Sequence, residues 1–278
     1  MQMPQMPLKT NLRLGVVDFL NTTPLISGME HVDEVEFIRK VPSELIGCLE
    51  RREVDIAIAS SIDYQRSKAD LRILPVGVLS SEGETLTVQL CSNVPFEQIT
   101  EVHCDTDSHT SIILLQIILK HKYGIAPKII PSDIRSLFIS GDEWPESVLI
   151  IGDKVITSAR DTTQPYCLDL GQAWADQTGL PFVFATWFGP ENLEPHLVNR
   201  ARLILDRQRR YNEQRIEQVV SRHAGDRGWS PEIAFQYLTH HMQYSFTQQH
   251  SKSLSLFFKL AASLSLINTP RSVQYYSE

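Results

Sequence analysis

Strand-like and helical segments alternate over the first 60 residues, and this alternation restricts the fold more than any other feature. Leu12–Phe19, Val35–Arg39 and Val54–Ile58 are rich in apolar strand formers. Helix-like segments, Thr22–Met29 and Pro42–Arg52, separate them. Buried strands that alternate with helices are typical of a parallel sheet with both faces covered, so the sequence predicts an α/β fold.

A second αβ series follows the break at Asn93-Val94-Pro95. It contains the helix Thr110–Tyr123, which Gly124 closes, and a helical turn at Asp153–Ser158. Its expected strands are Val102–Asp105, Lys128–Pro131, Val148–Ile151 and Tyr166–Leu168. Beyond Pro190 the pattern becomes helical, with expected helices at Leu193–His223, Pro231–His241 and Ser251–Ala262.

Two arrangements fit this order of elements. One is a two-lobed fold in which residues 1–92 begin the first lobe, residues 93–185 form an inserted second lobe, and residues 186–278 return to the first. A ligand would then bind in the cleft between the lobes, where strands end and helices begin. The other is a single doubly wound sheet with a helical tail.

Composition excludes some functions. The formal net charge of −7 argues against nucleic-acid binding, which needs a basic surface. The four cysteines are far apart in the sequence and form no Cys-x-x-Cys pair, so neither a zinc site nor a redox pair is indicated. No segment is long enough to span a bilayer, and the first residues lack the apolar region of a secretory signal. We therefore expect a cytoplasmic protein that is not associated with a membrane.

Polar residues follow several expected strands. Asn21 follows the first strand, where it suits the cap of the next helix. Ser60 and Ser61 follow the third strand, where their hydroxyls suit either an ordinary cap or a carboxylate ligand. Gly152 permits close backbone approach after a later strand, and the next residue, Asp153, suits a cap better than an orienting acceptor.

The turn at residues 105–111 is the strongest candidate for an anion site. Ser108, His109, Thr110 and Ser111 lie where a strand passes into an apolar helix. Free N–H groups at a helix start, together with short hydroxyls, bind carboxylates well. Two aspartates, at 105 and 107, complicate this interpretation because they also suit the turn itself.

Residues 169–187 predict a short helix followed by a buried strand. Asp169 and Gly171 open the helix, and Gly179 suits its left-handed cap. The apolar run at 181–185 then favours a strand that crosses a sheet.

This segment closely resembles one in the chorismate dehydratases of the futalosine route to menaquinone. The segments at 18–25, 105–111 and 150–153 also resemble that family, and the likeness extends from Leu12 to about Ala262. The resemblance implies a two-lobed fold similar to the type II periplasmic binding proteins, with a cleft between the lobes. It also implies a lyase that removes water from chorismate to give 3-[(1-carboxyvinyl)oxy]benzoate, with no metal or other cofactor.

The resemblance further implies site residues. Asn21 matches a pocket asparagine of the family, so we expect it to contact the substrate during catalysis. Thr87 stands where the family has a pocket serine, and it keeps the hydroxyl. His109 replaces the usual arginine, while Ser60 and Asp63 replace the proline and glutamate of a Pro-Ser-x-Glu-Tyr pattern.

No side chain in these motifs stands out as the catalytic base, so the enolpyruvyl carboxylate of the substrate is one candidate for that role. Two other functions stay open. A 1,4-dihydroxy-6-naphthoate synthase of the same pathway has a similar fold, but its first strand ends in a Ser-Pro-Cys-Pro-Asn-Asp-like turn, which Asp18–Leu25 does not match. A solute-binding protein for a small carboxylate has similar lobes without catalysis.

Overall fold

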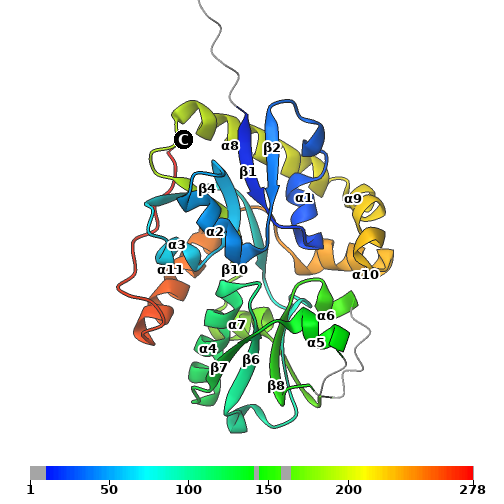
Figure 1. The fold of residues 1–278 in the computed structure, drawn as a ribbon, viewed down its shortest axis with the longest axis vertical. Helices are drawn as coiled ribbons and strands as arrows, with labels where there is room; N and C mark the ends of the chain where they lie inside the picture. Colours follow the sequence, from blue (N-terminus) through cyan, green and yellow to red (C-terminus); the bar gives the residue numbers. More distant parts are fainter. Residues whose placement is uncertain (1–10, 141–143, 158–163, 278) are drawn as a thin grey trace, which may run out of the picture.

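The structure is a computed structural model that describes residues 11–140, 144–157 and 164–277. These residues form two five-stranded sheets, one in each of two lobes (Figure 1). The α/β, two-lobed fold expected from the sequence is therefore confirmed. The alternative of a single doubly wound sheet is wrong.

The first sheet has the strand order β2-β1-β3-β10-β4. Strands β2, β1 and β3 run parallel, and β10 runs antiparallel to both of its neighbours. Its strands are β1 (Leu12–Val16), β2 (Val35–Arg39), β3 (Ile56–Ser60), β4 (Leu71–Ser81) and β10 (Phe182–Pro190).

The second sheet has the order β7-β6-β8-β5-β9. Here β7, β6 and β8 run parallel, and β5 runs antiparallel to β8 and β9. Its strands are β5 (Val88–Ser92), β6 (Glu101–Asp105), β7 (Lys128–Ser132), β8 (Ser147–Ile151) and β9 (Tyr166–Asp169).

Two strands lie in a different lobe from the one expected. The sequence analysis assigned 88–92 to the first lobe and the strand at 181–185 to the second, whereas β5 pairs in the second sheet and β10 in the first. An apolar run indicates that a strand is buried but does not identify its partners. We propose that the chain passes between the lobes at residues 82–87 and again at residues 179–181.

The helices cover the faces of both sheets (Figure 1). Those of the second lobe are α4 (His109–Tyr123), α5 (Ile134–Ser140), α6 (Lys154–Thr157) and α7 (Leu170–Thr178). Those that precede the second lobe are α1 (Thr23–Ile26), α2 (Pro42–Glu50) and α3 (Asp63–Arg66). Those that follow it are α8 (Pro195–Glu213), α9 (Ile216–His223), α10 (Pro231–Gln236) and α11 (Gln248–Ser263). No helix in these described ranges is long and apolar enough to cross a membrane.

The helix expected at 193–223 is divided in two. Arg215 has φ of −137°, which ends α8 and lets α9 begin in a new direction. Just before this break, the buried Asn212 side chain donates to the carbonyl oxygens of Pro24 and Ser27. The end of α8 is thereby fixed to the segment around α1, a tertiary contact that helical periodicity does not reveal.

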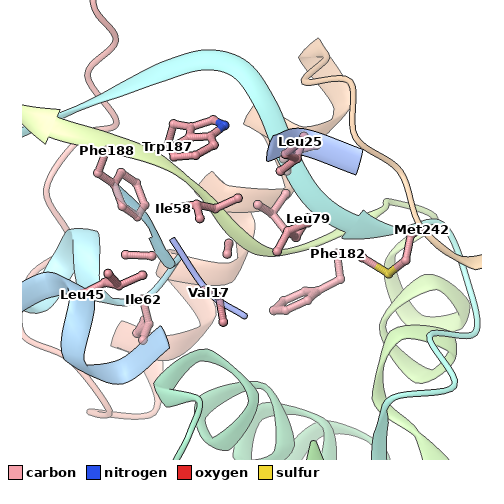
Figure 2. Close-up of a cluster of buried hydrophobic side chains, with 14 of the residues drawn as sticks. Val17, Leu25, Leu45, Ile58, Ile62, Leu79, Phe182, Trp187, Phe188 and Met242 are labelled. Carbon is pink, nitrogen blue, oxygen red and sulfur yellow. The ribbon is translucent and has the colours of Figure 1, made fainter. Parts of the chain in front are cut away.

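The core continues from one lobe into the other through β10. Phe182, at the start of this strand, makes edge-to-face contacts with Trp174 of α7 and Phe257 of α11, at centroid distances of 5.2 and 5.0 Å. Trp187 and Phe188, further along the strand, are also buried, on opposite sides of it (Figure 2). The segment that the sequence analysis singled out therefore joins the two lobes by packing.

Two of the cysteines that are far apart in the sequence are neighbours in the fold. Cys91 on β5 lies opposite Cys167 on β9, and their sulfur atoms are 3.6 Å apart. Neither cysteine forms a disulfide. Spacing along the chain therefore missed a pair of thiols that antiparallel pairing brings together.

Candidate active site

A cavity of about 560 Å³, including its mouth, lies between the two sheets. Phe19, Ile151, Phe184 and Met242 contribute to its apolar surface. Its polar surface comes from both lobes and from the segment that joins them: Asn21, Ser60, Thr85, Thr87, Ser108 and Ser111. Among the described residues, none of those lining this cavity has a carboxyl, amino, guanidinium, imidazole, phenol or thiol group. Such a surface holds a ligand through neutral hydrogen-bonding groups.

Asn21 reaches the cavity from the turn after β1. It lies inside a 3₁₀ turn, Leu20–Thr22, and neither helix start there has a side-chain cap. The expectation that Asn21 caps the following helix is therefore wrong. Its side-chain oxygen accepts from the Thr22 hydroxyl at 3.3 Å, and its side chain is close enough to Tyr237 to lower the pKa of that phenol.

The two serines after β3 face different ways. Ser60 lines the cavity, as a substrate contact requires. The neighbouring Ser61 is fully buried, and its hydroxyl donates to the carbonyl oxygen of Val183 at 2.8 Å. Successive side chains of an extended strand point to opposite faces. Ser61 therefore does not line the cavity, and its hydroxyl anchors β10 instead.

The second lobe contributes the start of α4. Ser108 is the N-cap of this 15-residue helix, and its hydroxyl oxygen accepts from the backbone N–H of Ser111. The two serine hydroxyls are 3.1 Å apart, and both residues line the cavity. Ser108 is therefore the cap of α4, and its hydroxyl also lies beside the free N–H groups of the helix start.

The other two residues of this turn connect the lobes. His109 Nδ1 lies 2.8 Å from a carboxylate oxygen of Asp63, and the Thr110 hydroxyl oxygen accepts from the backbone N–H of Ile62. Burial raises the pKa of Asp63, whose side chain is only 2% exposed. His109 and Asp63 both depart from the family patterns, and they are each other's partner. Neither His109 nor Thr110 lines the cavity.

Gly152 and Asp153 follow β8 and meet the turn after β1. Gly152 lines the cavity with φ of +74°, and a Cβ atom there would lie 3.3 Å from the Phe19 ring. The Asp153 carboxylate accepts from the backbone N–H of Leu20, at 3.1 and 3.2 Å. The interpretation of Asp153 as a cap is therefore wrong, because it is an acceptor that spans the two lobes. Burial raises the pKa of Asp153 to about 6.

Asp169 fixes the wall that carries Thr87. One of its carboxylate oxygens caps α7, and the other accepts from the backbone N–H groups of Thr85 and Leu86. A Cβ atom on Gly171 would come within 2.3 Å of the Thr85 side chain, so only glycine permits this approach. Residues 169–171 thus shape the cavity from behind, without lining it.

Sequence reasoning missed Tyr237, a fully buried residue at the start of a π-helical turn, Tyr237–His241. Its hydroxyl lies 2.9 Å from the Thr87 hydroxyl, and the Asn21 side chain is close enough to lower its pKa. Burial raises its pKa above the ordinary range, so the phenol is protonated at neutral pH. An aromatic residue in an amphipathic helix is ordinary core, and no local pattern marks this one.

The structure therefore divides the predicted site residues into two groups. Those that line the cavity are Asn21, Ser60, Thr87, Ser108, Ser111 and Gly152. Those that hold the cavity together are Ser61, His109, Thr110 and Asp153. Among the described residues no group of three His, Cys, Asp or Glu side chains could hold a metal ion. Contact of the first group with a substrate remains a prediction.

The sequence matches a protein family and is similar to named proteins. A family model described as menaquinone biosynthesis matches residues 12–263. A chorismate dehydratase of Thermus thermophilus is 27% identical over 241 residues, which are 81% of this chain and 86% of that protein. A chorismate dehydratase of Campylobacter jejuni is 27% identical over 178 residues, which are 62% of this chain and 64% of that protein.

Solved structures share the fold at low sequence identity. A protein of Archaeoglobus fulgidus has a TM-score of 0.75 at 16% identity and covers 92% of this chain and 98% of its own. The alkanesulfonate-binding protein SsuA of Xanthomonas axonopodis, bound to MOPS, has a TM-score of 0.71 at 15% identity, with coverage of 95% and 96%. These matches establish a periplasmic-binding-protein-like fold.

Proposed function

Because the chain belongs to the menaquinone biosynthesis family, we propose that it is a chorismate dehydratase, a hydro-lyase that forms 3-[(1-carboxyvinyl)oxy]benzoate. The observation that supports this most is the cavity between the lobes. Its described polar wall consists of hydroxyls, one amide and the start of α4, which suits a small carboxylate ligand.

The chemistry needs few groups from the protein. The proton on C3 of chorismate is acidic because its removal delocalises charge through the ring diene into the ring carboxylate. Departure of the 4-hydroxyl then forms the third ring double bond, and the proton and hydroxide together leave as water. The reaction is redox-neutral, so it requires no electron acceptor. Positioning and fixed hydrogen-bond donors are therefore the main contributions that a protein must supply.

We assign roles on this basis. The start of α4, with Ser108 and Ser111, holds a substrate carboxylate, because a helix start favours an anion. Asn21, on the opposite wall, orients the ring or supports the departing hydroxyl through its amide. Since no ionisable side chain is found among the described lining residues, the enolpyruvyl carboxylate of the substrate is the proposed base for the C3 proton.

The proposal includes the cellular location. The four cysteines form no disulfide and one of them is exposed, which suits a reducing compartment, so we place the reaction in the cytoplasm.

A turnover assay tests the function directly. Purified protein is incubated with chorismate, with and without a chelator, and the mixture is analysed by mass spectrometry and ultraviolet absorbance. We expect an aromatic product lighter than chorismate by one water, formed equally with the chelator. Tight binding of chorismate without any product would favour a solute-binding protein. Loss of activity with the chelator and its return with zinc would contradict the metal-free chemistry.

A further inference from the structure

We propose that Tyr237 is a positioning residue, whose buried hydroxyl fixes Asn21 and Thr87 in the orientation that the dehydration needs. The inference rests on the proposed function and extends it to a residue behind the cavity wall. Asn21 and Thr87 line the cavity from different parts of the chain, whereas Tyr237 is not among its lining residues. Tyr237 therefore acts on the substrate only through these two side chains.

The hydroxyl of Tyr237 lies beside both side chains. It is 2.9 Å from the Thr87 hydroxyl, and the Asn21 side chain is close enough to lower the pKa of the phenol. The Thr87 hydroxyl can donate onward to the carbonyl oxygen of Thr85, at 3.4 Å. A phenol has one proton to donate and lone pairs to accept, so one hydroxyl serves both neighbours.

The ring of Tyr237 is itself fixed on several sides. It stacks on Trp229 with a centroid distance of 4.9 Å and an interplanar angle of 15°. It also begins the π-helical turn that follows α10, and the backbone N–H of Met242 donates to its carbonyl oxygen. Single π-helical turns are rare and occur often at functional sites. The hydroxyl is thus held at a fixed point against the back of the wall.

Asn21 requires such a support because of its own geometry. Its terminal torsion is broad, and the turn that carries it is only three residues long. Its amide oxygen accepts one hydrogen bond from the Thr22 hydroxyl, at 3.3 Å, and a second fixed neighbour holds the amide more firmly. A misplacement of about 1 Å in a positioning group can reduce a rate by about 100-fold. The Tyr237 hydroxyl, as that neighbour, restricts the amide to one orientation.

The protonation of Tyr237 supports positioning over direct proton transfer. Burial raises the pKa of the phenol, and the neighbouring Thr87 and Asn21 side chains counter this shift only in part. Asp153 and Asp169, the carboxylates that act on it, raise its pKa further. The hydroxyl therefore keeps its proton at neutral pH and remains available to hydrogen-bond.

The test is Tyr237→Phe, which removes the hydroxyl and keeps the ring stacked on Trp229. We expect kcat for chorismate to fall by about 10-fold or more while KM changes by less than about threefold, since the hydroxyl positions groups for the transition state. Tyr244→Phe is the matched control, because Tyr244 is also a buried tyrosine and its hydroxyl has no partner among the described residues. This control should keep the wild-type kcat.

Tyr237→Phe is also made in the Asn21→Ala protein, which distinguishes a role in positioning Asn21 from a general disturbance of the structure. If Tyr237 acts through Asn21, Tyr237→Phe should lower the kcat of the Asn21→Ala protein by less than about threefold, because the effects of coupled residues are not additive. A loss equally large in both backgrounds would overturn the inference. A folded Tyr237→Phe enzyme with wild-type kcat would also overturn it, and would leave the proposed function intact. Absence of turnover by the wild-type protein would instead contradict the proposed function, and this inference with it.

A second pair of variants covers the case in which Tyr237→Phe does not fold. Thr87→Ser keeps the hydroxyl that lies beside Tyr237, and Thr87→Val removes it with little change in volume. We expect Thr87→Val to lower kcat by about 10-fold, as for one lost positioned hydrogen bond, and Thr87→Ser, which restores the hydroxyl, to lower it less. A Thr87→Val enzyme with wild-type kcat would contradict the inference.

Discussion

The two sheets have the same strand order, yet their first strands end in different turns. In each sheet the order is second, first and third strand of the local series, then an antiparallel strand, then an edge strand. β10 occupies the antiparallel position in the first sheet, and β5 occupies it in the second. β1 and β6 thus have equivalent places, and both lead into the cavity.

The turn after β6 opens a long helix, whereas the turn after β1 does not. α4 has 15 residues, an N-cap at Ser108 and a left-handed end at Gly124. After β1 the chain forms a three-residue 3₁₀ turn and a four-residue helix, neither with a side-chain cap. Of these two turns, the one after β6 therefore offers the aligned dipole and free N–H groups that bind an anion.

The first lobe offers a side-chain amide that other parts of the protein hold in place. Asp153 of the second lobe accepts from the backbone N–H of Leu20, and the phenol of Tyr237 lies close to the Asn21 side chain. We infer that the turns after β1 and β6, which have equivalent places, have different roles. In this account the second lobe binds the substrate anion, and the first lobe positions the reacting ring.

The largest expected effect is that of Asn21→Ala. Loss of one positioned donor should reduce kcat by about 100-fold. Steady-state kinetics with chorismate measures the effect, and the melting temperature is recorded on the same sample. Asn192→Ala is a control, since Asn192 bonds Arg52 on the protein surface. An Asn21→Ala enzyme that is less stable but fully active would remove this residue from the site.

A smaller effect is expected for the turn of the second lobe. Ser108→Ala with Ser111→Ala removes both hydroxyls from the start of α4, and a hydrogen bond to a charged group is worth about 1.5–3 kcal/mol. KM for chorismate should rise by about 10-fold or more, while kcat falls less than in Asn21→Ala.

Ser136→Ala, on an exposed part of α5, is the control for the double variant. The KM of this control should match that of the wild type. If the double variant keeps wild-type KM and a normal fold, the anion binds elsewhere and the comparison between the two turns fails.

The smallest effect concerns the bond from Asp153 to the first lobe. Burial raises the pKa of this carboxyl from 3.8 to about 6, so between these values the folded protein holds a proton that the unfolded chain releases. The contribution of Asp153 to stability is therefore fully present below pH 4 and is lost as pH rises toward 6, by at most about 1.4 kcal/mol per pH unit.

Asp153→Asn keeps an acceptor for the Leu20 N–H and removes the titration. The free energy of unfolding of wild type minus that of the variant should fall from pH 4 to pH 6 and stay level above pH 7. Urea unfolding at a series of pH values measures it. Parallel curves for the two proteins would mean that Asp153 is not the buried, titrating link between the lobes.

Local patterns in the sequence predicted the elements and the fold class but not the partners of the crossing strands. Gly179, with φ of +66°, ends α7 as expected, because a left-handed cap has a local signature. β5 and β10 were assigned to the wrong lobes because pairing depends on contacts far along the chain. The same reason explains the missed break between α8 and α9.

In the candidate site, too, local patterns were predictable and long-range contacts were not. Ser108 was predictable, since an N-cap before an apolar helix is a local pattern. The pairing of His109 with Asp63, from segments 46 residues apart, was not. Tyr237 lies 150 residues from Thr87 and was not predictable either, because only the folded chain brings the two hydroxyls together.

The most direct test of the division between the lobes is the affinity of the Asn21→Ala protein for chorismate. Because this variant turns over slowly, calorimetric titration gives its Kd. We predict that this Kd lies within about threefold of the wild-type KM for chorismate. The reason is that binding depends on the start of α4, whereas only turnover depends on Asn21. A Kd weakened by about 100-fold, in step with the loss of turnover, would contradict the account.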